Sequence, residues 1–229
     1  TGTSAYEHLA QAVADGLIAE AVLDQAVLRI LEAQFELGLF EAPYVDEAEA
    51  EAVLASPAHR DLARTAAERS AVLLRNEGGL LPLGPSMRKV AVLGPLADAP
   101  RDCLGPWVFE QDLSETVTIR AGIAATAPAG VTVDYAPGVA MPMRQNPWPF
   151  GRMHERDDRA DWAGFDAAAE LARAVDLARA ADVAVLVLGE RYDMSGEIAS
   201  VSTLDLAGRQ MELLEAVAAT GTPVVVLLM

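Results

Sequence analysis

The sequence predicts an α/β fold in which an open, mostly parallel sheet is flanked by helices, as in an α/β sandwich. Three continuous apolar runs of strand length support this prediction, at residues 90–93, 183–188 and 224–229. Segments with helical spacing of apolar residues, 167–181 and 206–220, separate the later runs. Continuous apolar strands that alternate with helices are typical of a parallel sheet covered on both faces. We therefore expect an α/β domain at residues 88–229.

Composition excludes several classes of protein. The chain has 229 residues, 52% of them hydrophobic, so it is not a disordered chain. Its 17 basic and 34 acidic residues give a net charge of −17, which repels nucleic acid and anionic membranes, and we expect neither as a partner. The apolar runs are far shorter than the roughly 18 residues of a membrane span. A single cysteine, Cys103, excludes an intramolecular disulfide framework.

The first residues have helical spacing but no apparent core. Tyr6, Leu9 and Val13 predict one helix, and a second is expected from about Ala19 to Leu37, where Gly38 suits a helix C-cap. These two helices cannot bury their apolar faces on each other alone. We therefore expect residues 1–46 to be the end of something larger.

A connector at residues 47–87 is expected to contain one helix. Ser56 is a candidate N-cap with Pro57 in the first helical position, and the pattern continues through Leu73. The helix is expected to break before Asn76, and an extended segment then leads into the α/β domain.

Within the α/β domain, the strand at 90–93 is followed by a segment that enters a helix, 116–125, and by a short alternating strand, 131–136. Residues 142–162 form a loop that is long for a compact domain. The last strand ends the sequence at Met229 without the loop that normally follows a parallel strand. This pattern predicts a chain truncated at both ends.

In an open parallel sheet, ligands bind outside the carboxyl ends of the strands. The segment after the first strand, Gly94–Asp98, lacks the G-x-G-x-x-G pattern, and Pro95 removes a backbone donor that a phosphate would need. A nucleotide site is therefore not expected there. No histidine pair has metal-ligand spacing, and Ser195 lacks the G-x-S-x-G elbow, so we expect no metal site and no serine-hydrolase chemistry.

The loop at 189–197 holds three carboxylates, from Glu190, Asp193 and Glu197. Gly189 and Gly196 permit tight turns that could project them. Paired carboxylates suit general acid/base catalysis at a glycosidic bond, but acidic loop residues can equally be simply solvated. Spacing alone leaves both interpretations open.

Three tryptophans have two interpretations each. Trp107 is either a core residue or a platform on which a sugar stacks, and the sequence does not favour one. For Trp148 and Trp162 in the long loop, packing is the favoured interpretation.

Several segments in collinear order resemble the C-terminal part of glycoside hydrolase family 3, of the bacterial β-glucosidase type. They are DQAVLRILEAQFELGLFEAPYVD, HRDLARTAAERSAVLLRNEGGLLPL, KVAVLGPLAD, LGPW, ADVAVLVLGERYDMSGEIAS and LDLAGRQMELLEAVAATGTPVVVLLM. The resemblance implies that residues 1–46 are the helical tail of a (β/α)8 barrel and residues 88–229 the α/β sandwich domain.

The resemblance also implies a retaining exo-β-glycosidase that needs no cofactor, with an Asp nucleophile from the barrel and a Glu acid/base from the sandwich domain. The most favoured activity is that of a β-D-glucosidase acting on β-linked oligosaccharides or aryl and alkyl β-glucosides. A β-xylosidase and a non-catalytic sugar-binding module are the alternatives. The nucleophile would lie outside this sequence, and a homo-oligomer and either a bacterial cytoplasmic or an exported location are compatible with the family.

The family pattern assigns the acid/base to Glu197, with Glu190 as the alternative, because a short polar-Leu-Asp stretch follows Glu197. Val201 stands where the family usually has Arg, which puts sugar-hydroxyl contacts and loop orientation in doubt. The expected substrate contacts are Trp107, Glu190, Met194 and Ser195.

Overall fold

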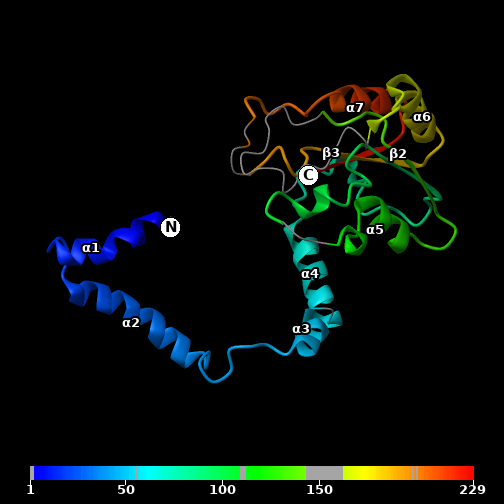
Figure 1. Cartoon of the computed structure of the whole chain (residues 1–229). Coiled ribbons are helices and arrows are strands. Elements are labelled where there is room, and N and C mark those ends of the chain that lie inside the picture. Colours follow the sequence, from blue (N-terminus) through cyan, green and yellow to red (C-terminus); the bar gives the residue numbers. More distant parts are fainter. Residues whose placement is uncertain (1–2, 55, 109–111, 143–161, 197–198, 200) are drawn as a thin grey trace. The chain divides into compact units, whose positions relative to one another are not determined.

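A computed structural model of the chain describes residues 3–54, 56–108, 112–142, 162–196, 199 and 201–229. The chain divides into two compact units, Thr1–Leu74 and Arg75–Met229 (Figure 1). Each unit is described by itself.

The first unit consists of helices without a core of their own. They are η1 (Thr3–His8), α1 (Leu9–Ala14), α2 (Glu20–Glu36), α3 (Glu47–Leu54) and α4 (Pro57–Ser70). None of the described side chains in α1 to α4 is buried, and Val22, Ile30 and Phe35 of α2 are 61–64% exposed. This confirms the prediction that the first helices do not bury their apolar faces on each other.

Helix ends in the first unit follow local capping chemistry. Ser56 is the N-cap of α4 as predicted, because its side chain accepts a hydrogen bond from the backbone N–H of His59. The predicted extension of this helix through Leu73 is wrong, since Ala71 already has extended backbone angles. Helix α3 was not predicted; Asp46 starts it by accepting from the N–H of Glu49.

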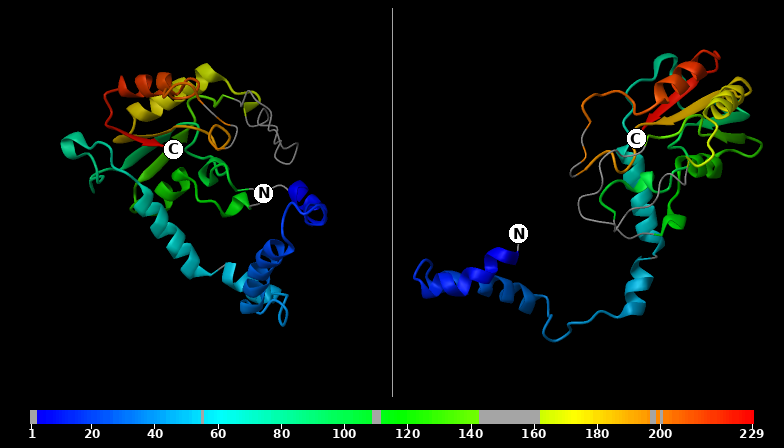
Figure 2. Two further views of the ribbon diagram at one scale, coloured as in Figure 1. Left: turned by 90° about the vertical axis from the view of Figure 1, so that its left-hand side faces the viewer. Right: turned by 45° about the horizontal axis from the view of Figure 1, so that its top comes forward.

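The second unit contains a four-stranded, fully parallel sheet with the order β2-β1-β3-β4. Its elements are η2 (Glu77–Gly79), β1 (Lys89–Leu93), η3 (Asp102–Leu104), η4 (Leu113–Glu115), α5 (Ile119–Thr126), β2 (Thr132–Ala136), α6 (Ala167–Arg179), β3 (Val183–Leu188), α7 (Gln210–Ala218) and β4 (Val224–Leu228). Helices α6 and α7 lie together over one face of the sheet, as Figures 1 and 2 show, and α5 packs on the other. The predicted α/β sandwich is confirmed.

The core has two layers, one on each face of the sheet. Ala91 and Leu93 of β1 point into the layer beneath α6 and α7, whereas Val90 and Val92 point into the layer beside α5. All six residues of β3 are buried, because this strand lies between β1 and β4 and is covered on both faces. Alternation of side chains along each strand therefore explains why the sequence shows continuous apolar runs.

Two predicted elements of this unit differ from the structure. The last strand was expected to be buried, but Val226 and Leu228 are 42% and 58% exposed because β4 is the edge strand of the described sheet. Helix α7 was expected from Leu206 and begins at Gln210, since Gly208 adopts a left-handed turn with φ of 65°.

Gly94 marks the point where the chain leaves β1 for the candidate site. It has φ of 117°, and a Cβ atom there would lie 2.2 Å from the carbonyl oxygen of Val187 in β3. Because both the backbone angle and the close approach exclude a side chain, only glycine fits without displacing one of the two strands.

We expect Gly94→Ala to lower the free energy of unfolding by roughly 2–4 kcal/mol, from backbone strain plus a clash with β3. Gly130→Ala is the matched control: Gly130 has φ of 86° with no atom within 4 Å of an added Cβ, so only strain of about 1 kcal/mol is expected. Urea denaturation of both variants measures the difference. Equal losses in the two variants would contradict the close-approach argument.

Candidate functional site

Two loops meet at the carboxyl edge of the sheet, one after β1 and one after β3. The backbone N–H of Tyr192 donates to Oδ1 of Asp102 at 3.0 Å. A Cβ atom on Gly196 would lie 3.1 Å from Cβ of Pro106 and 3.8 Å from Nε1 of Trp107. The loop after β3 therefore rests on the loop after β1 up to Gly196, the residue that directly precedes Glu197 in the chain.

Arg101 links the same two loops through a different pair of contacts. Its Nη1 donates to the carbonyl oxygen of Val108 at 3.1 Å, next to Trp107. Its guanidinium lies 4.5 Å from the ring centre of Tyr192, within the range of a cation–π interaction. Together with the Asp102 hydrogen bond, this fixes the start of the second loop relative to the exposed Trp107.

The loop after β3 contains its own buried ion pair. Arg191 and Asp193 have side chains only 6% and 10% exposed, and Nε of Arg191 lies 3.3 Å from Oδ1 of Asp193. Because opposite charges attract more strongly in a poorly solvated place than in water, this pair favours one conformation of the loop. Sequence reasoning counted Asp193 among three solvated or catalytic carboxylates and did not find this pair.

The four residues that the sequence predicted to contact substrate have different surroundings in the structure. Trp107 is 56% exposed, so it is not a core residue, and Ser195 is also exposed. Met194 packs its side chain against the core layer beside α5. Glu190 is half-buried at the end of β3, where its N–H donates to the carbonyl oxygen of Met229 at 3.2 Å. Glu197 lies outside the described residues.

The remaining residues that the sequence singled out are accounted for as follows. Trp162 is half-buried and makes an edge-to-face contact with Phe165, with ring centres 5.0 Å apart, as the packing interpretation predicted. Trp148 and His154 lie outside the described residues, and His8 and His59 are exposed.

Within the described part of the chain, no group of three His, Cys, Asp or Glu side chains could hold a metal ion. No described helix is long and apolar enough to cross a membrane.

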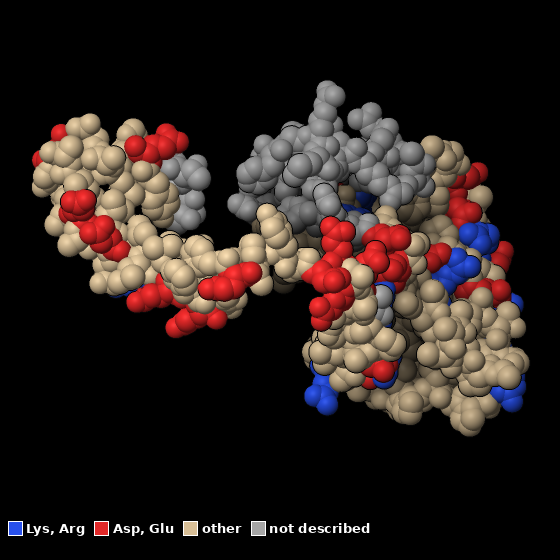
Figure 3. Space-filling model, turned by 60° about the horizontal axis from the view of Figure 1, so that its bottom comes forward, with Lys and Arg blue, Asp and Glu red and all other residues tan. Residues whose placement is uncertain are grey.

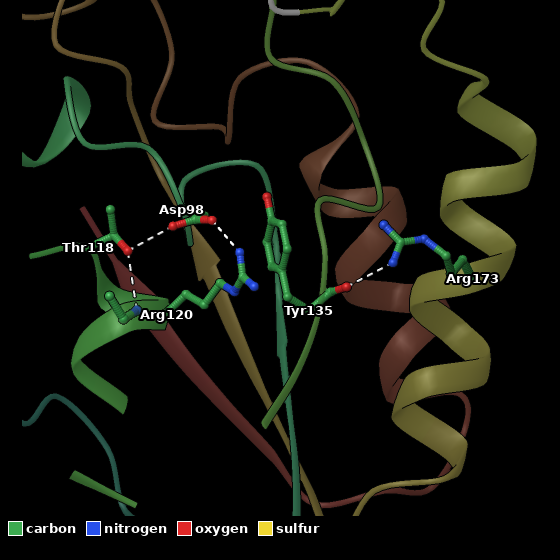
Figure 4. A network of polar contacts seen from close by, with 6 residues as sticks. Asp98, Thr118, Arg120, Tyr135 and Arg173 are labelled. Carbon is green, nitrogen blue, oxygen red and sulfur yellow. Dashed lines mark hydrogen bonds and ion pairs between the residues drawn. The ribbon is translucent and has the colours of Figure 1, made fainter. Parts of the chain in front are cut away.

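A polar network that sequence reasoning missed fixes the chain after β1 (Figure 4). Asp98 accepts a hydrogen bond from Thr118 Oγ1 at 2.8 Å and forms an ion pair with Arg120. Thr118 also caps α5 by accepting from the N–H of Ala121. The guanidinium of Arg120 lies 4.8 Å from the ring centre of Tyr135, and Arg173 of α6 donates to the Tyr135 carbonyl at 2.8 Å. The network thus joins β1, α5, β2 and α6.

The sequence contained a signal for this network. Asp98 follows the strand-ending Gly94 by four residues, and Thr118 has the position and chemistry of a helix N-cap. Pairing the two requires knowing that α5 starts beside the carboxyl end of β1, which spacing along the chain does not reveal.

A cavity of about 420 Å³ opens at the carboxyl ends of β1, β2 and β3. Its wall combines aromatic rings with charged groups: Asp98, Arg101, Asp102, Tyr135, Trp162, Phe165, Glu170, Arg173, Arg191 and Tyr192, together with prolines, Ala99 and Met141. The charged groups are held largely by one another and by backbone carbonyls, as in the network of Figure 4. The cavity therefore marks the edge where the loops converge.

Burial changes two proton equilibria near this cavity. It raises the pKa of Tyr135 to about 12, and the nearby carboxylate of Asp98 adds to the effect. Burial likewise raises the pKa of the Cys103 thiol, so this cysteine is not an activated nucleophile.

Acidic side chains are more widespread than basic ones over much of the face drawn in Figure 3, in line with the net charge of −17.

These features define an open α/β sandwich domain in which the loops after β1 and β3 meet at the carboxyl edge of the sheet, the edge at which domains of this kind bind ligands. A sequence profile of the glycosyl hydrolase family 3 C-terminal domain matches residues 71–229. The chain belongs to this family.

Relatives and solved structures agree with this assignment. The chain is 34% identical to a periplasmic β-glucosidase of Salmonella typhimurium over 97% of its length, and 32% identical to a β-xylosidase of Formosa agariphila over 90%. Its structure matches a β-glucosidase involved in saponin metabolism from intestinal bacteria, with a TM-score of 0.80, 32% identity and full coverage of the chain. A Listeria innocua β-glucosidase in complex with glucose matches 99% of the chain, with a TM-score of 0.75 and 30% identity. The chain spans 29%, 26%, 32% and 28% of these four proteins, respectively.

The raised pKa of Tyr135 predicts a loss of stability in alkali. In the unfolded chain the phenol ionises near its usual value of 10, whereas in the folded protein it stays protonated to about 12. The unfolded state therefore loses its proton first, and stability falls as the pH rises from about 10 to about 12. We expect Tyr135→Phe to make this fall shallower, as measured by urea denaturation at about pH 9 and about pH 11. An unchanged pH dependence would show that the Tyr135 pKa is not raised.

Proposed function

We propose that this chain provides the acid/base side of a retaining exo-β-glycosidase, with β-D-glucosidase as the favoured activity. In this proposal Glu197 is the general acid and base. An Asp from a (β/α)8 barrel outside this sequence is the nucleophile. The Salmonella typhimurium relative is more than three times as long as the chain, which is long enough to include such a barrel. Terminal β-glucosyl residues of oligosaccharides and aryl or alkyl β-glucosides are the proposed substrates.

The first chemical step breaks the glycosidic bond. The Asp carboxylate attacks the anomeric carbon and forms a glycosyl ester, while the bond from that carbon to the leaving-group oxygen breaks. The protonated carboxyl of Glu197 donates its proton to this oxygen, so that the leaving group departs as a neutral alcohol. Glu197 is then a carboxylate.

The second step restores both carboxyl groups. Glu197 removes a proton from water, and the water oxygen attacks the anomeric carbon as the bond to the Asp oxygen breaks. The Asp is released as a carboxylate, Glu197 is protonated again, and the sugar leaves with its original anomeric configuration. Two inversions at the same carbon give this retention.

The observation that best supports the proposal is the position of Gly196 beside Pro106 and Trp107, where an added Cβ atom would lie 3.1 Å from Cβ of Pro106 and 3.8 Å from Nε1 of Trp107. It brings the residue before Glu197 against an exposed indole on the neighbouring loop. An exposed aromatic face suits stacking against the apolar face of a sugar ring or against an aryl group. Because an acid/base must lie beside the leaving-group oxygen, we assign Trp107 to the leaving-group side of the bond.

A β-xylosidase is the second candidate, favoured by the 32% identity to the Formosa agariphila relative. The two activities differ in recognition of the hydroxymethyl group at C5 of the transferred sugar, which the proposal assigns to the barrel. Comparing turnover of matched aryl glucosides and xylosides separates the two. A non-catalytic sugar-binding module would bind these compounds without turning them over.

We expect the loss of kcat/KM caused by Glu197→Gln in the full-length protein to depend strongly on the leaving group. With alkyl β-glucosides, whose leaving oxygen needs a proton, kcat/KM should fall roughly 100- to 10,000-fold. With dinitrophenyl β-glucoside, whose leaving group departs as a stable anion, kcat/KM should change much less. Steady-state kinetics on both substrates gives the result.

Glu190→Gln is the matched control, since Glu190 lies on the same loop and was the alternative acid/base. A leaving-group dependence in this variant and none in Glu197→Gln would transfer the role to Glu190. Loss of turnover for neither variant would overturn the proposed chemistry for this loop.

We expect Trp107→Ala to weaken turnover of oligosaccharides more than turnover of small aryl glucosides, with a loss of about 1–2 kcal/mol in kcat/KM for the larger substrates. The measurement compares cellobiose and longer glucosides with nitrophenyl glucoside. Equal losses on both substrate types would indicate a packing role, against the 56% exposure of this side chain.

A further inference from the structure

We propose that Gln210 is the positioning residue of the catalytic loop, defined as residues 190–206 between β3 and α7. The inference rests on the proposed function, because it assigns Gln210 the task of holding the loop that contains Glu197. Gln210 itself touches no reacting atom in this proposal.

The side chain of Gln210 is fully buried and its amide binds both ends of the catalytic loop. Oε1 accepts from the N–H of Gly189 at 2.9 Å, and Nε2 donates to the carbonyl oxygen of Gly189 at 2.8 Å. Nε2 also donates to the carbonyl oxygen of Ala207 at 2.9 Å. Both amide hydrogens and the amide oxygen are therefore used, on the residues directly before and directly after the loop.

The backbone of Gly189 needs such a partner because the sheet ends there on one side. Toward β4, the neighbouring residues are paired: the carbonyl of Leu188 accepts from the N–H of Met229, and the N–H of Glu190 donates to Met229. The N–H and carbonyl of Gly189 point the opposite way, toward β1, as alternation along a strand requires. There β1 has already turned away at Gly94, so the amide of Gln210 replaces the missing strand.

A glycine at position 189 is part of the same arrangement. Gly189 has φ of 137°, and a Cβ atom would lie 2.2 Å from the carbonyl oxygen of Met229. The backbone is thus fixed by β4 on one side and by Gln210 on the other. One side chain that also holds Ala207 sets the distance between the two ends of the loop, which restricts the loop's conformations.

A catalytic acid must be held close to the leaving-group oxygen, and a displacement of about 1 Å can cost about 100-fold in rate. Loss of the Gln210 amide removes this partner from the buried N–H and carbonyl of Gly189 and from the half-buried carbonyl of Ala207, which favours rearrangement of both loop ends. The effect of a Gln210 substitution on catalysis should then be a weaker form of the effect expected for Glu197→Gln. It should be large where proton donation limits the rate and small where it does not.

The experiment compares Gln210→Met with Val217→Ala in the full-length protein. Methionine has nearly the shape of glutamine but no amide, whereas Val217 is buried in the same helix two turns further on and its apolar side chain cannot hydrogen-bond to either loop end. Both variants remove packing or polar contacts from α7, so a general loss of stability affects both. Only Gln210→Met removes the hydrogen bonds to Gly189 and Ala207.

For Gln210→Met we expect kcat/KM on an alkyl β-glucoside to fall about 100-fold while kcat/KM on dinitrophenyl β-glucoside stays within about threefold. Hydrogen exchange of the loop amides should be faster than in the natural protein. Val217→Ala should change both substrates equally and leave loop exchange unaltered. Should Gln210→Met fail to fold, Gln210→Glu tests the same bonds, since a carboxyl group can donate at most one hydrogen bond where the amide donates two.

Equal effects on the two substrates in the variant that folds, as in Val217→Ala, would overturn the positioning role. The leaving-group test of Glu197→Gln separates this failure from failure of the proposed function. If Glu197→Gln is selective for the alkyl glucoside and the Gln210 variant is not, only the inference about Gln210 falls. If neither is selective, the assignment of Glu197 falls as well.

Discussion

Complete burial of β3 is the constraint on which the rest of the second unit depends. Its six apolar residues are covered by neighbouring strands and by both core layers, so no functional group can lie along the strand. Polar chemistry is therefore confined to the point where the strand ends. Gly94 and Gly189 allow the backbones of adjacent strands to approach each other closely there, and the two loops diverge from that edge. A rigid sheet thus supports an edge built almost entirely from loops.

Most of the fold could be predicted from the sequence because each strand and each well-capped helix has a local signature. The runs that form β1 and β3 are apolar throughout, and Ser56 and Thr118 have the side chains that start helices. The errors lie where tertiary position decides. The exposure of Val226 and Leu228 follows from the place of β4 at the sheet edge, and an apolar strand looks the same in sequence at the edge and in the centre.

Less of the candidate site was predictable, since it is assembled from contacts between distant residues. The position of the loop after β3 was foreseen from strand order, and the exposure of Trp107 excludes the core position that the sequence had left open for it. The contact of Arg101 with Tyr192 could not be read in advance, because it joins residues about 90 positions apart. The same holds for Gln210, which looks like one more polar residue at a helix start until the end of β1 is located.

The proposed acid/base role of this chain would divide substrate recognition between this domain and the barrel. In a double displacement the nucleophile and the transferred sugar lie on one side of the scissile bond, and the acid/base lies beside the leaving group. If the chain supplies the acid/base as proposed, the loops around Trp107 face the leaving group, and the barrel recognises the transferred sugar. Glucosidase and xylosidase relatives can then share this domain with about equal identity, 34% and 32%, because the sugar that distinguishes them is recognised elsewhere.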